Sequence, residues 1–265
     1  MRIAAVQLPA RFAPGDPSWD RLHSRLRTET IDLLILNELP LGEWSVDTED
    51  YDPTIARDLH QTYETLLGRL AELPVGAVLT TRAILGRHRL VNQAVFITGT
   101  GVVPLHCKHI FPQEPGFFEQ SWFEMPRPQF KTSDFHGLHI GVLICTELMF
   151  SELARGYGHA GAHLIAVPRA SENIENWVVA ARMAALASGC YVASSNRHGV
   201  GANGLRFGGG GFIVAPGGEV LAMTSEDSPV VVAEIDLELV RTRQSDYPCY
   251  LDPDFLRLSR RGGSQ

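Results

Sequence analysis

Apolar residues along this chain alternate between short continuous runs and longer stretches of helical period. The short runs have the length and the Val, Ile, Leu and Ala content of buried β-strands, and they span residues 3–8, 33–36, 76–81, 92–97, 140–145, 164–167, 191–194, 212–215 and 230–235. Amphipathic stretches separate several of them, at 18–30, 55–73, 147–160 and 172–188, the last with Ser171 as its candidate N-cap. The alternation predicts a layered α/β fold.

In the middle of the chain and again after residue 194, strand patterns follow one another without helices. This order predicts mixed sheets with antiparallel hairpins, one of which turns at 216–219, Pro-Gly-Gly-Glu. No linker or low-complexity stretch divides the sequence, so residues 1–265 are expected to form a single domain. From about 241 to 265, aromatic residues and proline occur with little periodicity, which predicts an extended C-terminal tail packed on a partner subunit.

Composition narrows the class of protein. The chain has 45% apolar and 20% charged residues, which is ordinary for a globular α/β protein, and its net charge of −7 argues against a nucleic-acid partner. No apolar stretch reaches 18 residues, so no membrane span is predicted. The first eight residues have the pattern of a strand rather than of a signal peptide, and a cytoplasmic location is expected.

The cysteines and histidines do not form a recognisable metal or disulfide pattern. The chain has four cysteines, Cys107, Cys145, Cys190 and Cys249, and they lie too far apart for a C-x-x-C pair. The ten histidines include no His-Glu-x-x-His motif. We therefore expect reduced thiols and no metal site.

Cys145 has the position of a nucleophile. It follows the apolar run 138–144 and precedes a helical pattern, which is where a strand-to-helix turn is expected. At such a turn the helix N-terminus would stabilise a thiolate and lower the pKa of the thiol. The alternative is a buried apolar cysteine, since free cysteine is among the most buried residue types.

Three further ionisable residues stand beside apolar runs. Glu38 closes the run 33–36, at the end of a predicted strand, where α/β folds place their ligands. Lys108 and Glu119 lie eleven positions apart in a loop-like segment with aromatic neighbours. Taken singly, a residue of this kind is more often a solvated surface charge than a catalytic group.

Together with Cys145, these residues resemble the motifs of the nitrilase superfamily of carbon–nitrogen hydrolases, and the resemblance spans nearly the whole chain. The segment 37–40, Asn-Glu-Leu-Pro, is similar to the glutamate motif of that family, 108–119 to its lysine loop and 141–147 to its cysteine elbow. Asn37 stands where the family usually has proline, and Thr146 where it usually has an aromatic residue.

The resemblance implies a four-layer α-β-β-α sandwich of two mixed sheets, in a homodimer or higher oligomer whose C-terminal tails cover the partner. It also implies that Cys145 attacks the carbonyl carbon to form a thioester, with Glu38 as general base and acid. Lys108 and the backbone N–H of Thr146 would hold the oxyanion, and Glu119 would orient Lys108 or the substrate. No cofactor is implied.

The substrate is expected to be a small linear amide or N-carbamoyl compound. Candidate substrate-binding residues are Thr146, Trp44, Phe117, Trp122 and Arg169, although the aromatic residues could equally belong to the core and Arg169 to the surface. Glu147 could orient the elbow backbone or complement a helix N-terminus. A nitrilase and a catalytically silent interaction module remain alternatives, whereas a serine hydrolase is disfavoured because the chain has no G-x-S-x-G elbow.

Overall fold

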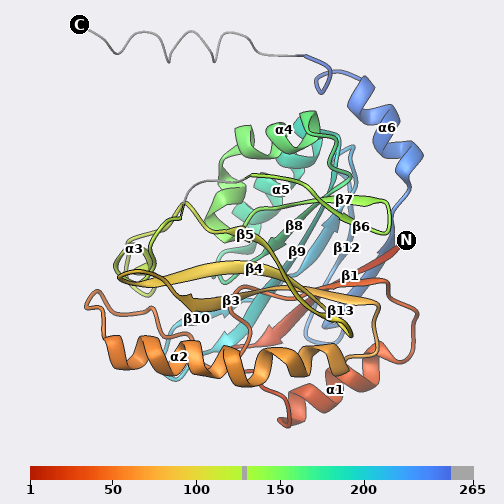
Figure 1. Cartoon of the computed structure of the whole chain (residues 1–265). Helices are drawn as coiled ribbons and strands as arrows, with labels where there is room; N and C mark the ends of the chain where they lie inside the picture. Colours follow the sequence, from red (N-terminus) through yellow and green to blue (C-terminus); the bar gives the residue numbers. More distant parts are fainter. Residues whose placement is uncertain (127–129, 252–265) are drawn as a thin grey trace, which may run out of the picture.

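The computed structural model describes residues 1–126 and 130–251, and its described strands form one hydrogen-bonded network with two halves (Figure 1). The first half contains, in spatial order, β5 (Gly101–Cys107), β4 (Leu90–Thr98), β3 (Ala77–Leu85), β2 (Leu33–Ile35), β1 (Arg2–Pro9) and β13 (Val230–Glu234). The second half contains β6 (Ser133–Phe135), β7 (Leu138–Val142), β8 (Leu164–Pro168), β9 (Tyr191–Val200), β11 (Phe212–Val214) and β12 (Val220–Met223). Both halves mix parallel and antiparallel pairs, as predicted.

The two halves are joined where β1 and β9 run parallel, at residues 7–9 and 196–198. The short strand β10 (Arg206–Gly208) pairs antiparallel with the end of β9. The predicted turn at 216–219 connects β11 to β12, and it is closed by hydrogen bonds from Ala215 N to Glu219 O (2.8 Å) and from Gly218 N to Ala215 O (2.8 Å). The predicted hairpin is therefore confirmed.

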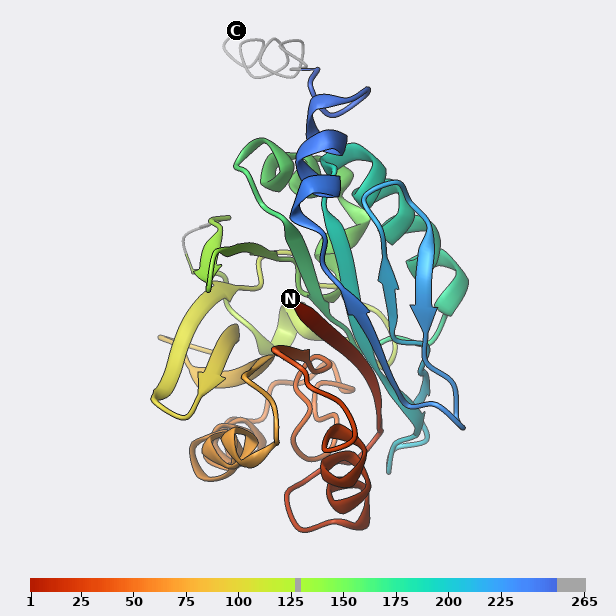
Figure 2. The ribbon, with the colours of Figure 1, turned by 90° about the vertical axis from the view of Figure 1, so that its right-hand side faces the viewer.

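The two-residue period of the strands divides the apolar side chains between two cores. In β1, Ile3 and Ala5 enter a core that also contains residues of β7, β8 and β9, whereas Ala4 and Val6 enter a core covered by α1 (Pro17–Leu26) and α2 (Pro53–Leu66). On the far side, α4 (Ser151–His159) and α5 (Ile174–Ser188) cover the second sheet, as Figure 2 shows. The predicted four-layer α/β architecture is confirmed.

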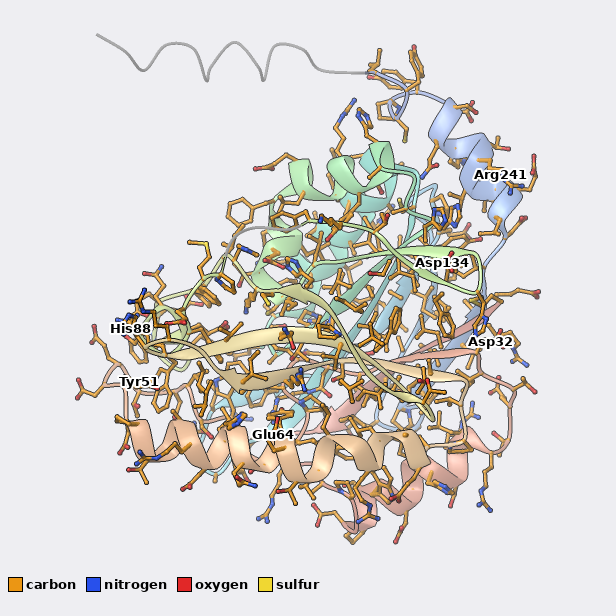
Figure 3. All side chains as sticks on the ribbon, viewed as in Figure 1. Asp32, Tyr51, Glu64, His88, Asp134 and Arg241 are labelled. Atoms are coloured by element: carbon orange, nitrogen blue, oxygen red, sulfur yellow. The ribbon has the colours of Figure 1, made fainter. Side chains whose placement is uncertain are left out.

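The observed helices agree with the amphipathic patterns in the sequence, but several of them begin or end at other residues than predicted. α2 buries Ala56, Leu59 and Tyr63 and exposes Glu64 (Figure 3), and the 3-10 helix η1 (Leu67–Glu72) continues it. The predicted helix 147–160 is divided into the 3-10 helix η2 (Cys145–Met149) and α4, because the backbone at Phe150 leaves the helical region. None of the helices in residues 1–126 and 130–251 is long and apolar enough to cross a bilayer.

The predicted N-cap of α5 is wrong by two residues. α5 begins at Ile174, and the side chain of Asn173 caps it by accepting a hydrogen bond from Asn176 N (3.2 Å). Ser171 is held elsewhere, because its N–H donates to Asn196 Oδ1 (3.0 Å) and its hydroxyl accepts from Arg169.

The extended tail predicted from about residue 241 is also wrong where the structure describes it. The helix α6 (Leu237–Ser245) includes residues 241–245, because the Asp236 side chain caps it through Glu238 N (2.9 Å) and Val240 is fully buried. Turns follow at 246–250. Residues 252–265 of the predicted tail lie outside the described residues, and its packing on a partner stays a prediction.

Candidate active site

Cys145 stands at a sharp elbow between β7 and η2. Its backbone has φ +48°, in the left-handed region that a side chain with a Cβ rarely adopts. The thiol is 4% exposed, and Sγ lies 3.7 Å from the carbonyl oxygen of Ala170, which follows β8. The chain is thus turned so that Cys145 is the first residue of η2 rather than a residue of a strand.

Lys108 lies between two carboxylates, all three of them buried. Its Nζ donates to Glu38 Oε1 (2.7 Å) and to Glu119 Oε2 (2.6 Å), and no side chain of the three is more than 1% exposed. Glu38 follows β2, Lys108 follows β5, and Glu119 begins the short helix α3 (Glu119–Trp122). Residues far apart in sequence are therefore brought into one charged cluster, as the motifs predicted.

Asn92 of β4 also belongs to this cluster. Its Nδ2 donates to Glu38 Oε1 (2.7 Å), and its carbonyl oxygen accepts from Lys108 N (2.8 Å). The other carboxylate oxygen, Glu38 Oε2, is buried and has no hydrogen-bond partner among the described residues. It is consequently a free acceptor on a carboxylate whose charge acts on the Cys145 thiol. Sequence reasoning missed Asn92 because it lies inside an ordinary strand pattern.

The charges in the cluster shift one another's pKa values. Burial lowers the pKa of Lys108, but the charges of Glu119 and Glu38 outweigh burial and hold that pKa above its usual value. Burial raises the pKa of Glu119 to about 8, against the opposing effect of Lys108. Lys108 is therefore charged at neutral pH, and Glu119 keeps its proton to a higher pH than an ordinary carboxyl group.

The expected lowering of the thiol pKa is wrong for the resting site. Burial raises the pKa of Cys145, the charge of Glu38 raises it further, and Lys108 only partly opposes them. η2 is a single short 3-10 helix, so it has little of the dipole that the prediction assumed. The surroundings of the resting thiol therefore favour its protonated form.

Glu147 ties the elbow to the lysine loop. Its Oε2 accepts from Ile144 N (2.8 Å) and its Oε1 from His109 N (2.8 Å), so it holds the neighbours of Cys145 and of Lys108. It also contacts His106 Nε2 at 2.8 Å. Of the two roles left open for Glu147, the orientation of the elbow backbone is the one that these hydrogen bonds provide.

Glu147 and the two histidines near it form a cluster of potential metal ligands, which the sequence motifs did not reveal. Potential ligand atoms of His106, His109 and Glu147 lie within 4.8 Å of one another, and the Nδ1 atoms of both histidines are buried without a partner. The motif search missed it because Glu147 is distant in sequence. Both carboxylate oxygens already accept backbone N–H groups, which favours a hydrogen-bonding role for the cluster.

Cys145 opens into a cavity of about 380 Å³. Of the residues predicted to form the site, Cys145, Glu119, Thr146 and Phe117 line it, and Trp177 does as well. The lining is completed by Pro112, Glu114, Pro115, Ala170, Ser171, Glu172 and Asn173.

Trp44, Trp122 and Arg169 are absent from the lining that the described residues form. Trp122 is a core residue, fully buried, with Nε1 donating to Thr48 O (2.7 Å). Trp44 donates to Gly116 O (2.9 Å) and packs on Phe117, so it supports the cavity wall from behind.

Arg169 is neither a surface residue nor a free cation facing the cavity. It is fully buried, and its guanidinium donates to Ser171 Oγ (2.8 Å) and Gly210 O (2.7 Å). Its Cζ lies 5.3 Å from the ring centroid of Trp177. Burial lowers the pKa of Arg169 to about 9. Arg169 thus fixes the backbone of one cavity wall.

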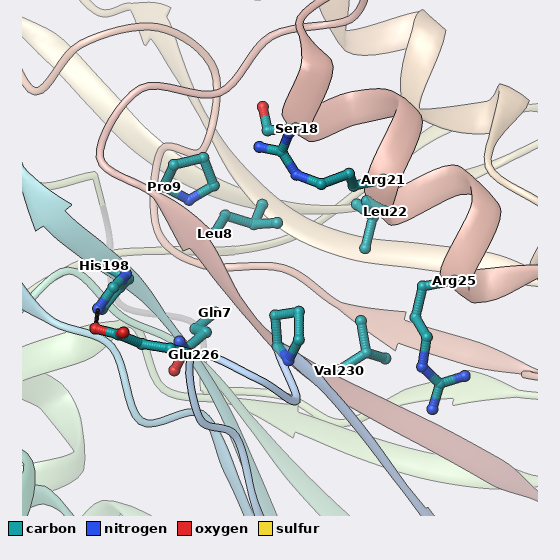
Figure 4. Close-up of a pocket in the computed structure, with 11 residues that line it drawn as sticks. Gln7, Leu8, Pro9, Ser18, Arg21, Leu22, Arg25, His198, Glu226 and Val230 are labelled. Carbon is teal, nitrogen blue, oxygen red and sulfur yellow. Dashed lines mark ion pairs between the residues drawn. The ribbon is translucent and has the colours of Figure 1, made fainter.

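A second and larger cavity, of about 550 Å³, lies between α1, β1 and the end of β9 (Figure 4). It shares no lining residue with the Cys145 cavity. Its walls include Leu8, Leu22 and Val230, and His198 Nε2 and Glu226 Oε1 lie 3.3 Å apart at its edge. These two side chains are 36% and 82% exposed, so this pair is a solvated one.

The elbow cysteine, the buried Glu–Lys–Glu cluster and the layered fold define the class of protein. A family model for carbon-nitrogen hydrolases matches residues 2–244, and the chain belongs to that family. The resemblance found in the sequence is thereby confirmed.

Known relatives agree with this assignment. An (R)-stereoselective amidase from Pseudomonas sp. is 29% identical, covering 98% of this chain and 93% of its own length. A nitrilase from Pyrococcus abyssi is 36% identical, covering 92% of this chain and 93% of its own length. The solved structure of a carbon-nitrogen hydrolase from Helicobacter pylori has the same fold, with a TM-score of 0.82 at 22% identity, and the match covers 97% of this chain and 98% of that chain.

Proposed function

We propose that this protein is a cysteine-dependent amidase that hydrolyses the C–N bond of a small linear amide or N-carbamoyl compound through a thioester. The observation that carries the proposal is the buried cluster in which Lys108 bridges Glu38 and Glu119, together with the cavity that Glu119 and Cys145 both line. Burying one lysine with two carboxylates is costly to stability, and clusters of this kind are typical of catalytic sites.

In the first step the thiol proton passes to Glu38 Oε2, which has no hydrogen-bond partner among the described residues, while Sγ bonds to the substrate carbonyl carbon. The carbonyl oxygen becomes an oxyanion, and Lys108 Nζ and the N–H of Thr146 are the donors that we assign to it. Glu38 then gives its proton to the leaving nitrogen. Ammonia or an amine departs, and an acyl group remains on Cys145.

In the second step Glu38 takes a proton from water as the water oxygen attacks the thioester carbon. The C–S bond breaks, a carboxylic or carbamic acid is released, and the proton returns to Cys145. We assign Glu119 the task of holding Lys108 in place, and, since it lines the cavity, of contacting the substrate nitrogen or oxygen. These steps need only the chain, its substrate and water.

The main alternative is a nitrile substrate, which the name of the Pyrococcus abyssi relative favours. A catalytically silent interaction module is the other alternative. The buried free acceptor at Glu38 Oε2 argues against it, because an unpaired buried carboxylate oxygen lowers stability without benefit to a purely structural site. We also propose a homodimer, to be tested by the mass of the protein in solution.

The test is ammonia release from aliphatic amides, ω-amidated dicarboxylates, N-carbamoyl amines and nitriles, with mass spectrometry of the enzyme during turnover. We expect at least one amide or carbamoyl compound to be hydrolysed and to add its acyl mass to Cys145. Turnover of nitriles alone would support the nitrilase alternative. Turnover that does not depend on Cys145 would contradict the proposed mechanism.

A further inference from the structure

The cavity above Cys145 has carboxylates at its rim, and basic side chains are absent from the lining that the described residues form. We propose that the preferred substrate has a cationic group, such as a protonated amine, at the end remote from the scissile bond; this proposal rests on the proposed function. The amide end would lie at Cys145, and the cation would lie at the rim between Glu114 and Glu172.

The two rim carboxylates come from separate segments. Glu114 belongs to the lysine loop before α3, and Glu172 to the loop between β8 and α5. Both residues are exposed, and neither forms an ion pair within residues 1–126 and 130–251. Their charges are therefore available to a ligand that enters the cavity.

Both segments are held by hydrogen bonds. Phe117 N donates to Glu114 O (2.8 Å), and Trp44 anchors the same turn through Gly116 O (2.9 Å). On the other segment, Asn196 and Arg169 fix Ser171, the neighbour of Glu172. The backbones that carry the two carboxylates are thus fixed, which limits the ordering that a bound cation must impose.

The cavity walls suit an apolar spacer. Besides the two rim carboxylates, the lining includes Phe117, Trp177 and two prolines, Pro112 and Pro115. They can pack on methylene groups, and the two aromatic faces can also attract a cation. A linear substrate with an amide at one end, methylene groups in the middle and an ammonium group at the other end fits this sequence of surfaces.

One feature opposes the proposal. α5 begins at Ile174 next to the rim, and the N-terminus of a helix favours an anion. The Asn173 side chain already caps that end, and Glu175 lies in the first turn of the helix. A substrate carboxylate would in addition face Glu114 and Glu172. We therefore expect repulsion of an anionic substrate to exceed the attraction of the helix end.

Three linear amides of equal length test the proposal: 5-aminopentanamide, hexanamide and the monoamide of adipic acid. They differ only in a terminal ammonium, methyl or carboxylate group. We expect kcat/KM to be about tenfold higher for 5-aminopentanamide than for hexanamide, lowest for the carboxylate, and the preference to weaken with salt, as for partly exposed charges. The difference should lie mainly in KM.

The double variant Glu114→Gln, Glu172→Gln should bring the ratio between 5-aminopentanamide and hexanamide close to one. Glu175→Gln is the matched control, since it removes a charge from the same helix end outside the cavity lining, and it should leave that ratio unchanged. An equal ratio in the wild type and the double variant, or a preference for the carboxylate, would overturn the proposal.

Binding to the Cys145→Ala variant separates this proposal from the proposed function. Calorimetry with the same three amides measures the charge preference without turnover. Tighter binding of 5-aminopentanamide supports the cation site even where no amide is hydrolysed, which would be a failure of the proposed function alone. Cys145-dependent hydrolysis with equal binding of all three amides would overturn the cation site alone.

Discussion

The Cys145 cavity and the cavity in Figure 4 differ most in how far their ionisable groups are buried. The cavity in Figure 4 is the larger, at about 550 Å³ against about 380 Å³, and its walls mix apolar residues such as Leu8 and Val230 with Arg21 and Arg25. Its His198–Glu226 pair is exposed to solvent. The smaller cavity ends at Cys145 and Glu119, behind which Lys108 and Glu38 are fully buried.

The comparison shows that the burial of ionisable side chains, rather than the volume of a cavity, distinguishes the candidate active site. An exposed pair is screened by water and contributes little to stability or to reactivity. A buried cluster has strong mutual interactions, shifted pKa values and a free acceptor at Glu38 Oε2. Substitutions in the two cavities should therefore have very different effects.

The largest effect is expected from Cys145→Ala, which removes the proposed nucleophile. The rate of ammonia release should fall by about 10⁴-fold or more, as for other covalent catalysts. His198→Ala, in the larger cavity, should change the same rate by less than about twofold, as is usual for exposed positions. Circular dichroism checks that both variants are folded. Comparable losses of the rate of ammonia release in the two folded variants would contradict the proposed difference between the cavities.

Lys108→Met should reduce kcat by about 10²- to 10³-fold, because it removes an oxyanion donor. It also leaves Glu38 and Glu119 buried without a cation, which should lower the free energy of unfolding by about 3–5 kcal/mol. Arg25→Met is the matched control at the larger cavity. Arg25 pairs with Glu29 at 2.6 Å in a partly exposed position, and its loss should lower that free energy by less than about 1 kcal/mol. Urea denaturation measures both.

Glu147→Gln should reduce kcat by about 10- to 100-fold with little change in KM, because small displacements between catalytic groups are costly. The amide keeps one acceptor oxygen, so either Ile144 N or His109 N loses its partner. Steady-state kinetics provide the test. A rise in KM at constant kcat would indicate a role in substrate binding instead.

The last prediction concerns the pH dependence of stability. The pKa of Glu119 is raised from 4.5 to about 8 in the folded protein. Between these values the unfolded chain releases a proton that the folded protein keeps, so the free energy of unfolding should fall as the pH rises from about 5 to about 8. Glu119→Gln should reduce this slope. An unchanged slope in that variant would show that Glu119 ionises normally.

Both the layers of the fold and the four residues of the candidate active site could be predicted from the sequence, but from different kinds of signal. The layers follow from local alternation, as in β1, where Ile3 and Ala4 enter opposite cores. Glu38, Lys108, Glu119 and Cys145 were found through the order of family motifs, since each alone has an ordinary explanation. The C-terminal prediction failed because α6 has little amphipathic pattern and depends on its Asp236 cap.

The residues that hold the candidate site in place through hydrogen bonds were the least predictable from the sequence. Asn92 and His106 act through hydrogen bonds to residues distant in sequence, so no local pattern distinguishes them from other strand residues. Trp122 and Arg169 were misplaced for a similar reason. Whether a large side chain lines a cavity or packs behind it depends on the path of neighbouring segments, as the bonds of Arg169 to Ser171 and Gly210 illustrate.

The contacts of Glu147 also have a consequence for folding cooperativity. One carboxylate joins the end of β5, the lysine loop and the elbow through His106, His109 and Ile144. Local opening of any one segment would break a bond within the fully buried part of the protein. The catalytic machinery should therefore have no separate melting step, and activity should disappear on heating over the same temperature range as the β-sheet signal.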